Sequence, residues 1–161
     1  MKFLKATEYQ DIVNQIFAKL SSELKTILVN TRIEHIGASS IPDAVSKGDL
    51  DVYVGVAKED FEESLAKIKK LNFVEKEDTL RTDELCMLCT DKYNYDVAVQ
   101  LVVNGSQFED FIAFRDLLRS NSRLLEDYNN LKRASSDLSS EKYREKKSIW
   151  VESILKDHIR N

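Results

Sequence analysis

A strand-like segment with two aspartates at its start constrains this chain more than any other feature. Residues 50–56, Leu-Asp-Val-Tyr-Val-Gly-Val, are rich in β-branched residues and predict a buried β-strand. Asp49 and Asp51 lie two residues apart, so in an extended chain their side chains point to the same face. Two neighbouring carboxylates repel each other unless a cation compensates them or their pKa rises. Taken alone, such a pair is more often two solvated aspartates in a turn. Together with the glycine-serine loop upstream of it, the pair predicts a site for Mg²⁺, which binds a few carboxylates along with substrate phosphates.

A loop of small residues precedes the acid pair. Its sequence, Gly37-Ala38-Ser39-Ser40, follows a short apolar segment. Gly37 permits positive φ and a close approach of the backbone to a ligand, and Ser39 and Ser40 add hydroxyl and amide donors. Donors that converge on one point form an anion-binding nest. Lys47, between loop and acids, is a candidate to contact a triphosphate, although a solvated lysine is an equally open interpretation. A phosphate nest beside paired carboxylates is the layout of metal-assisted phosphoryl or nucleotidyl transfer.

These residues resemble a known family. The pattern Gly-Ala-Ser, a spacer, and then Asp-Leu-Asp on a strand is similar to the signature of the polymerase-beta-type nucleotidyltransferases. Within them, residues 35–42, His-Ile-Gly-Ala-Ser-Ser-Ile-Pro, followed by Lys47, resemble the GrpB family, whose motif reads His-x-Gly-Ser-Thr-Ser-Val-Pro-Gly. Residues 114–119, Phe-Arg-Asp-Leu-Leu-Arg, and the later Lys132 and Lys147 are similar to the carboxy-terminal helical half of that family.

The resemblance implies a protein that binds a nucleoside triphosphate with Mg²⁺ (or Mn²⁺). It also implies transfer of a nucleotidyl group to an acceptor that the sequence does not identify. In the superfamily, a third acid on a neighbouring strand bridges a metal and serves as general base. Asp96, at the start of the predicted strand 95–103, is the matching candidate. We therefore expect Asp49, Asp51 and Asp96 to be catalytic, with one or two basic residues of the helical half contacting phosphate.

The chain departs from the family pattern at two places. Typical GrpB members have an apolar residue at the position of Asp49. They also carry His-x-His where this chain has Ala98 and Gln100. An alternative interpretation is therefore a catalytically inactive nucleotide- or metabolite-binding module on the same scaffold. A third is a protein-interaction role for the last helix, which an exposed apolar stripe over 139–159 would indicate.

The remaining periodicity predicts an α/β (α+β) fold, with a small mixed sheet of the nucleotidyltransferase type flanked by helices. Apolar spacing predicts helices over 8–29 and 58–70 and further strands over 31–36, 73–76, 84–90 and 95–103. From Ser106 onward the pattern is helical. We expect a single nucleotidyltransferase-like domain over 1–161, with a sheet-containing core (1–104), a helical carboxy-terminal part (105–161) and the site in the cleft between them.

Composition narrows the classes of partner. The net charge of −4 gives no general attraction to nucleic acid or to anionic membranes, so a small-molecule nucleotide is the expected partner and nucleic acid is not. No segment approaches the apolar length of a bilayer span, and the start turns polar too soon for a signal peptide. We therefore expect no membrane partner and a cytoplasmic location. Cys86 and Cys89 form a C-x-x-C, but a structural zinc site needs further ligands, so we interpret both as apolar strand residues.

Overall fold

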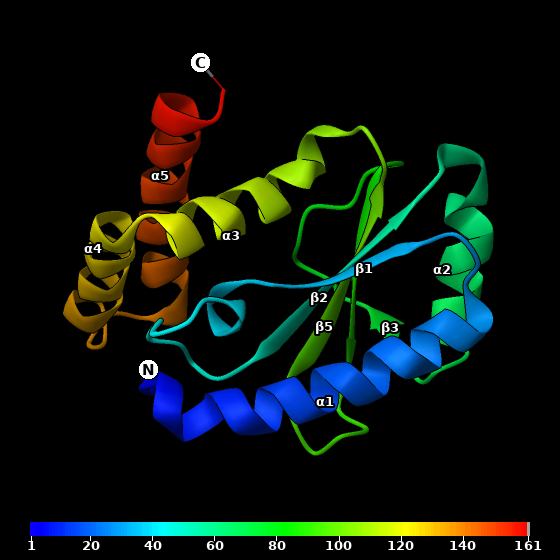
Figure 1. The fold of residues 1–161 in the computed structure, drawn as a ribbon, viewed down its shortest axis with the longest axis horizontal. Coiled ribbons are helices and arrows are strands. Elements are labelled where there is room, and N and C mark those ends of the chain that lie inside the picture. Colours follow the sequence, from blue (N-terminus) through cyan, green and yellow to red (C-terminus); the bar gives the residue numbers. More distant parts are fainter. Residues whose placement is uncertain (161) are drawn as a thin grey trace.

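A five-stranded mixed sheet lies at the centre of the molecule, with strand order β1-β2-β5-β4-β3 (Figure 1). The structure is a computed structural model that describes residues 1–160. Strands β2 (Leu50–Val56) and β5 (Val97–Val103) are parallel neighbours. The antiparallel strands are β1 (Arg32–Ile36), β4 (Leu85–Thr90) and the two-residue β3 (Val74–Glu75). Each predicted strand is therefore confirmed, with ends that differ by one or two residues.

Helices account for most of the rest of the chain. They are α1 (Ala6–Ile27), α2 (Phe61–Lys69), α3 (Asp110–Ser120), α4 (Ser122–Ala134) and α5 (Ser140–His158). Three short 3-10 turns, η1 (Ala38–Ser40), η2 (Lys58–Asp60) and η3 (Gln107–Glu109), complete the set within the described residues. The predicted helix over 58–70 therefore begins as a 3-10 turn. The predicted α/β fold with a helical carboxy-terminal part is confirmed.

The main core lies between the sheet and the helices α1 and α2. Side chains alternate along each strand, so every second residue of β2 and β5 points to these helices. Full burial of each such aliphatic side chain contributes about 1.5–3 kcal/mol. The cluster includes Leu20 and Leu24 of α1, Val52 and Val54 of β2, Leu65 and Ile68 of α2, and Val99 and Leu101 of β5.

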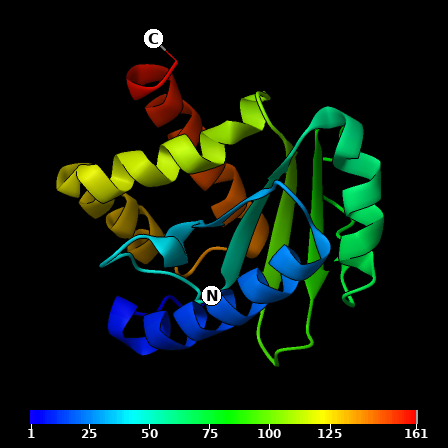
Figure 2. The ribbon, with the colours of Figure 1, turned by 45° about the vertical axis from the view of Figure 1, so that its right-hand side comes forward.

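The carboxy-terminal helices form a second cluster with the loop that follows β1. Figure 2 shows α3, α4 and α5 gathered on one side of the molecule, with α2 on the other. Ile41 and Ala44 of the loop pack against Tyr128 of α4 and Ile154 of α5. The ring of Trp150 stacks on that of Tyr128 with centroids 5.2 Å apart. The predicted phosphate loop is therefore anchored to the helical half by apolar contacts.

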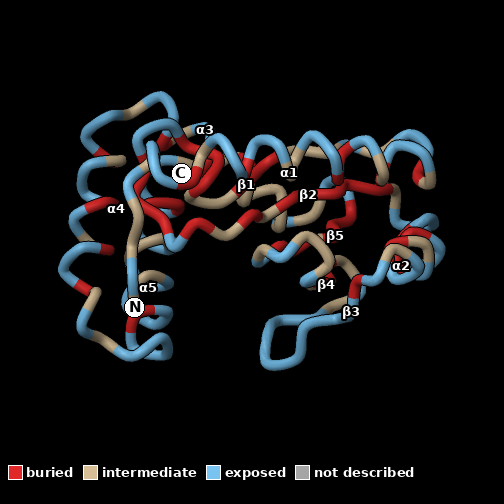
Figure 3. Tube along the Cα trace, turned by 90° about the horizontal axis from the view of Figure 1, so that it is seen from below, coloured by how far each residue is buried: buried red, intermediate tan, exposed pale blue. Residues whose placement is uncertain are grey.

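Burial is greatest in the two central strands (Figure 3). Every residue of β2 is buried except Asp51, and every residue of β5 is buried except Gln100. Both exceptions point to the sheet face opposite α1 and α2, because Val52 and Val99 point toward those helices. The sheet is therefore open beside Asp51 and Gln100. No helix within residues 1–160 combines the length and apolar character needed to cross a bilayer.

Candidate functional site

Asp51 lies directly against the turn that follows β1. Ile36, the last residue of β1, is paired with Asp51, and Gly37 comes next. A Cβ placed on Gly37 would lie 2.8 Å from Oδ2 of Asp51, which is closer than Cβ atoms are found to approach other atoms. Gly37 also has φ +74° and ψ −180°, a backbone conformation that is essentially confined to glycine. Glycine at this position therefore lets the carboxylate reach the backbone of the predicted phosphate loop.

Asp49 and Asp96 lie at the same edge of the sheet as Asp51. The parallel strands β2 and β5 begin in register, with Leu50 paired to Val97. Asp49 and Asp96 immediately precede this pair, and the amide of Leu50 donates to the carbonyl oxygen of Asp96 at 3.0 Å. Asp49 is half-buried, whereas Asp96 is exposed. The three predicted acids therefore lie at the same end of two neighbouring strands.

The charges at this edge act on Asp51. Burial, together with the negative charges of Asp49 and Asp96, raises the pKa of the Asp51 carboxyl to about 7, against the opposing positive charges of Lys147 and Lys47. Three predicted site residues, namely Asp49, Asp96 and the exposed Lys47, therefore lie close enough to Asp51 for their charges to act on it. Lys147 of α5 joins them from the carboxy-terminal end of the chain.

The two serine hydroxyls of the loop have partners within the protein. Oγ of Ser39 lies 2.9 Å from Nε2 of His35, and Oγ of Ser40 donates to the carbonyl oxygen of Gly37 at 2.6 Å. Both serines are buried. Burial, together with Arg119 and Arg115, lowers the pKa of His35 to about 4, so its ring is neutral near pH 7. The amide of Ser40 also donates within the turn, to the carbonyl oxygen of Gly37 at 3.1 Å. The groups left for an anion are therefore the backbone amides of residues 37–39 rather than these hydroxyls.

Side chains from the helices α1 and α4 hold the segment between Gly37 and Asp49. Tyr9 of α1 donates to the carbonyl of Ala44 at 2.6 Å, and Gln10 donates to that of Ile41 at 3.0 Å. From the other side, Asn129 and Lys132 of α4 bind the backbone of residues 43–45. Buried polar groups that lose a partner cost free energy, so these bonds restrict the loop to one conformation. They fix the segment that leads directly into Asp49.

Two arginines of the helical half contact this loop. Arg115 of α3 pairs with Glu34 at 2.8 Å and donates to the carbonyl of His35 at 3.0 Å. Arg119 donates twice to the carbonyl of Ser40, at 3.1 and 2.8 Å. Charge-assisted bonds of this kind are stronger than bonds between neutral groups. Both guanidinium groups therefore hold the turn in place through its backbone carbonyl oxygens, one before and one at the end of residues 37–40.

Replacing Asn129 with alanine is expected to lower the free energy of unfolding by about 2–4 kcal/mol. Oδ1 of Asn129 accepts from the amide of Val45 at 2.8 Å, and Nδ2 donates to the carbonyl of Asp43 at 3.1 Å, so alanine leaves two loop groups without their partners. Urea unfolding at pH 7 measures the loss. Asn130→Ala is the matched control, because the side chain of Asn130 makes an exposed bond to Arg133. Equal effects of both variants would contradict the role of Asn129.

The acid pair suits an ion that arrives with a phosphorylated ligand. Within residues 1–160, no group of three or more His, Cys, Asp or Glu side chains converges as a metal site. Mg²⁺ is commonly held by one or two carboxylates plus waters and substrate phosphates, so Asp49 and Asp51 meet its requirement without a third protein ligand. The partly buried acids, mutually repelling, provide the charge that such an ion compensates.

The cysteines do not enlarge this donor set. Cys86 is paired with Leu101 and belongs to the core under α1 and α2. Cys89 is paired with Ala98, three residues further along β4, and points to the opposite face. The two thiols of the C-x-x-C therefore lie on different faces of the sheet, as expected for strand residues.

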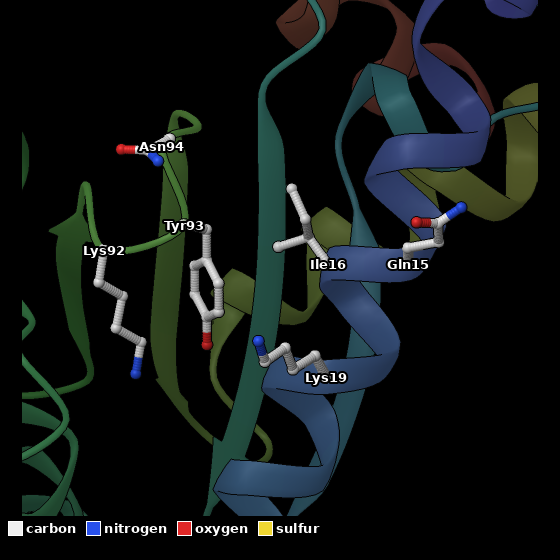
Figure 4. Close-up of a pocket in the computed structure, with 6 residues that line it drawn as sticks. All are labelled: Gln15, Ile16, Lys19, Lys92, Tyr93 and Asn94. Carbon is white, nitrogen blue, oxygen red and sulfur yellow. The ribbon is translucent and has the colours of Figure 1, made fainter.

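A separate concavity of about 340 Å³ lies between α1 and the turn that joins β4 to β5 (Figure 4). Within it, Nζ of Lys92 and the hydroxyl of Tyr93 both bind Glu23, at 2.8 and 3.1 Å. None of the predicted site residues contributes to its lining, which consists of Gln15, Ile16, Lys19, Lys92, Tyr93 and Asn94. The acids and the glycine turn, rather than this concavity, define the candidate site.

Comparison with known proteins agrees with the sequence motifs. The family model described as GrpB protein matches residues 4–157. The chain belongs to the GrpB family. A UPF0157 protein of Vibrio cholerae serotype O1 is 49% identical over 155 residues, which cover 96% of this chain and 82% of that protein. The crystal structure of the conserved protein GrpB from Enterococcus faecalis superposes with a TM-score of 0.77 and 25% identity, over 97% of this chain and 96% of that one.

A more distant similarity concerns Cid1 poly(U) polymerase, in a crystal structure with MgATP bound. The TM-score is 0.48 with 15% identity, over 69% of this chain and 36% of that chain. This similarity is too remote to assign a function. The GrpB assignment confirms the sequence resemblance, whereas the roles of individual site residues stay predictions.

Sequence reasoning missed the residues that hold the loop. Tyr9, Gln10 and Asn129 carry no motif, and their partners lie 31 to 86 positions away in the chain. One signal was available, because Asn129 interrupts an apolar helix face beside Tyr128. It indicates a buried amide but not the partner of that amide.

Proposed function

We propose that this GrpB-family protein binds a nucleoside triphosphate with Mg²⁺ (or Mn²⁺) and transfers its nucleotidyl group to an acceptor hydroxyl. One observation carries the proposal, namely the contact between the Gly37 backbone and the Asp51 carboxylate. A phosphate bound by the turn would lie beside the carboxylate that shares its metal. Such a reaction draws on triphosphates inside the cell, so the cytoplasm is the proposed location.

Each group would have a separate task. Asp49 and Asp51 would hold the metal ion, which when bound supplies positive charge to the transferring phosphoryl group. The backbone amides of residues 37–39 would orient the phosphates, because the amide of Ser40 already donates to the carbonyl oxygen of Gly37 at 3.1 Å. Lys47, exposed on the segment before Asp49, would add a point charge. Asp96, exposed at the start of β5, would accept the proton of the acceptor hydroxyl.

A second candidate function is nucleotide binding without turnover. Ala98 is the residue of β5 paired with Asp51, and its methyl group offers neither a metal ligand nor a base. Asp96 lies two residues earlier, before the strand begins. If that displacement keeps Asp96 from the acceptor, the site would bind the triphosphate but would not transfer its nucleotidyl group.

Thermal-shift titration with the four ribonucleoside triphosphates, with and without Mg²⁺, tests the substrate class. At a hundredfold excess over Kd, one triphosphate is expected to add about 2.7 kcal/mol of stability in Mg²⁺. For a chain of this size, that corresponds to a rise in Tm of roughly 5–10 °C. The absence of a rise with all four triphosphates would remove the proposed substrate class.

Asp96→Asn separates the two candidate functions. The enzyme predicts that this variant keeps the thermal shift but loses pyrophosphate release by at least about a hundredfold, as expected for a lost general base. Release is measured with the stabilising triphosphate and a metabolite extract as the source of acceptor. A wild-type protein that is stabilised but releases no pyrophosphate above the rate without protein would favour the binding module.

A further inference from the structure

One face of α5 carries a small concavity whose lining is basic. Its volume is about 250 Å³, and it is lined by Arg144, Lys147, Ser148, Val151 and Glu152. These positions are spaced by three and four residues, so they lie on one side of the helix. Two cations and a hydroxyl therefore face the same space.

Lys147 links this α5 face to the acid pair. It is half-buried, and Tyr128 and Tyr143 raise its pKa, as do Asp51 and Asp49, in opposition to burial. The ammonium group is therefore charged at neutral pH. Its charge in turn acts on Asp51. Lys147 therefore belongs both to the lining of the concavity and to the group of charges that act on the acid pair.

Arg144 supplies the positive charge of this face that is not offset by an acid. Glu152, the single acid in the lining, pairs with Arg160 at 3.0 Å. Within residues 1–160, Arg144 takes part in no ion pair. It is exposed, so its five guanidinium hydrogens are available to an anion from solvent.

We propose that the α5 face formed by Arg144, Lys147 and Ser148 is an anion subsite for a phosphate group of a polyphosphate ligand that also reaches the acid pair. A guanidinium group binds phosphate through two parallel bonds, and an ammonium group adds a point charge. The volume is below the roughly 300–1,000 Å³ of pockets for drug-sized molecules, so it suits a phosphoryl group rather than a whole nucleoside.

This inference deepens the proposed function and rests on it only for the identity of the ligand as a nucleotide. A phosphate carried by the acceptor would use the same chemistry. Lys147 would therefore serve two partners. Its charge offsets those of Asp49 and Asp51 in the free protein, and the same ammonium group would also attract a phosphate bound at the α5 face.

Calorimetric titration with inorganic tripolyphosphate, in EDTA and 0.15 M salt, tests the subsite without the metal. Arg144→Gln and Lys147→Gln are each expected to weaken binding about tenfold, as for the loss of one charged hydrogen bond. Lys146→Gln is the matched control. It removes the same charge from an exposed neighbour that is not part of the lining, and it is expected to leave binding within twofold.

The outcomes are distinct. Equal weakening by all three variants would show attraction to net charge alone and would overturn the subsite, as would the absence of tripolyphosphate binding to the wild-type protein. Lys147 is half-buried, so Lys147→Gln could unfold. In that case Arg144→Gln, a replacement of an exposed residue, still tests the subsite.

The nucleoside triphosphate, titrated in Mg²⁺, then identifies the source of the phosphate. Weaker triphosphate binding by Arg144→Gln assigns the subsite to the nucleotide tail. Unchanged triphosphate binding, with tripolyphosphate binding still weakened, assigns it to a phosphate on the acceptor. Failure of the subsite would leave the Mg²⁺-dependent thermal shift and its loss in Asp51→Asn intact, so the two proposals fail independently.

Discussion

Replacing Gly37 with alanine is expected to abolish stabilisation by the Mg²⁺–triphosphate complex. The new Cβ would lie 2.8 Å from Oδ2 of Asp51 and 3.3 Å from its Cβ. Either the carboxylate or the turn must therefore move. The carboxylate is the proposed metal ligand, and the turn is the proposed donor to the phosphates, so either movement disrupts the site. The free protein is also expected to lose about 1–3 kcal/mol, because alanine rarely adopts φ +74° with an extended ψ. Thermal shift with and without ligand measures both effects.

Gly105→Ala provides the matched control for Gly37. Gly105 has a similar φ of +84°, but a Cβ placed there meets no atom within 4 Å. Its alanine variant therefore carries a backbone cost without displacing the acid pair. We expect it to lower Tm and to keep the ligand-induced shift. If Gly37→Ala also kept that shift, the contact between turn and carboxylate would have no part in ligand binding.

Replacing Asp51 with asparagine is expected to stabilise the metal-free protein above pH 7 and to remove its response to Mg²⁺ and triphosphate. The pKa of Asp51 is raised in the folded protein from 3.8 to about 7 by burial and by Asp49. Between these values the folded state binds the proton and the unfolded state does not. Wild-type stability therefore falls as the pH rises from about 4 to 7, and the full loss persists above pH 7.

Asparagine does not titrate in this range, so the stability of the variant does not fall through this group as the pH rises. At about 1.36 kcal/mol per pKa unit, it is expected to exceed the wild type by about 2–4 kcal/mol at pH 8 in EDTA. The two are expected to converge near pH 4. Urea unfolding at pH 4, 6 and 8 measures the difference. Asp91→Asn, in the exposed turn after β4, is the control and should track the wild type. A variant less stable than wild type at pH 8 would show that Asp51 is not destabilised by its neighbours.

A triphosphate shift that survived intact in Asp51→Asn would instead contradict the metal assignment. The combination of gained stability and lost ligand response is the signature of a residue retained for binding rather than for the fold. No replacement that merely damages the core would produce both effects.

Local pattern was sufficient to predict the strands and helices, because their apolar periodicities are strong. The buried run of β2, interrupted only at Asp51, was evident in the sequence, and the GrpB motif indicated the loop. The ends of the strands were less predictable. The predicted strand 95–103 included Asp96, whereas β5 begins one residue later, at Val97. Strand ends depend on which backbone groups find partners in neighbouring strands, and a single segment does not contain that information.

The sequence by itself determined that two carboxylates share a strand face and that a glycine turn precedes them, because both follow from short-range geometry. Only the tertiary structure decided what those groups contact. It committed the serine hydroxyls and Arg115 and Arg119 to internal bonds, and it brought Lys147 from the last helix to the acid pair. The physical reason is that the arginine and lysine contacts join residues about 80 to 100 positions apart, and packing of the helices against the sheet selects them. The serine bonds are local, but burial of the turn decides that these hydroxyls bind within the protein.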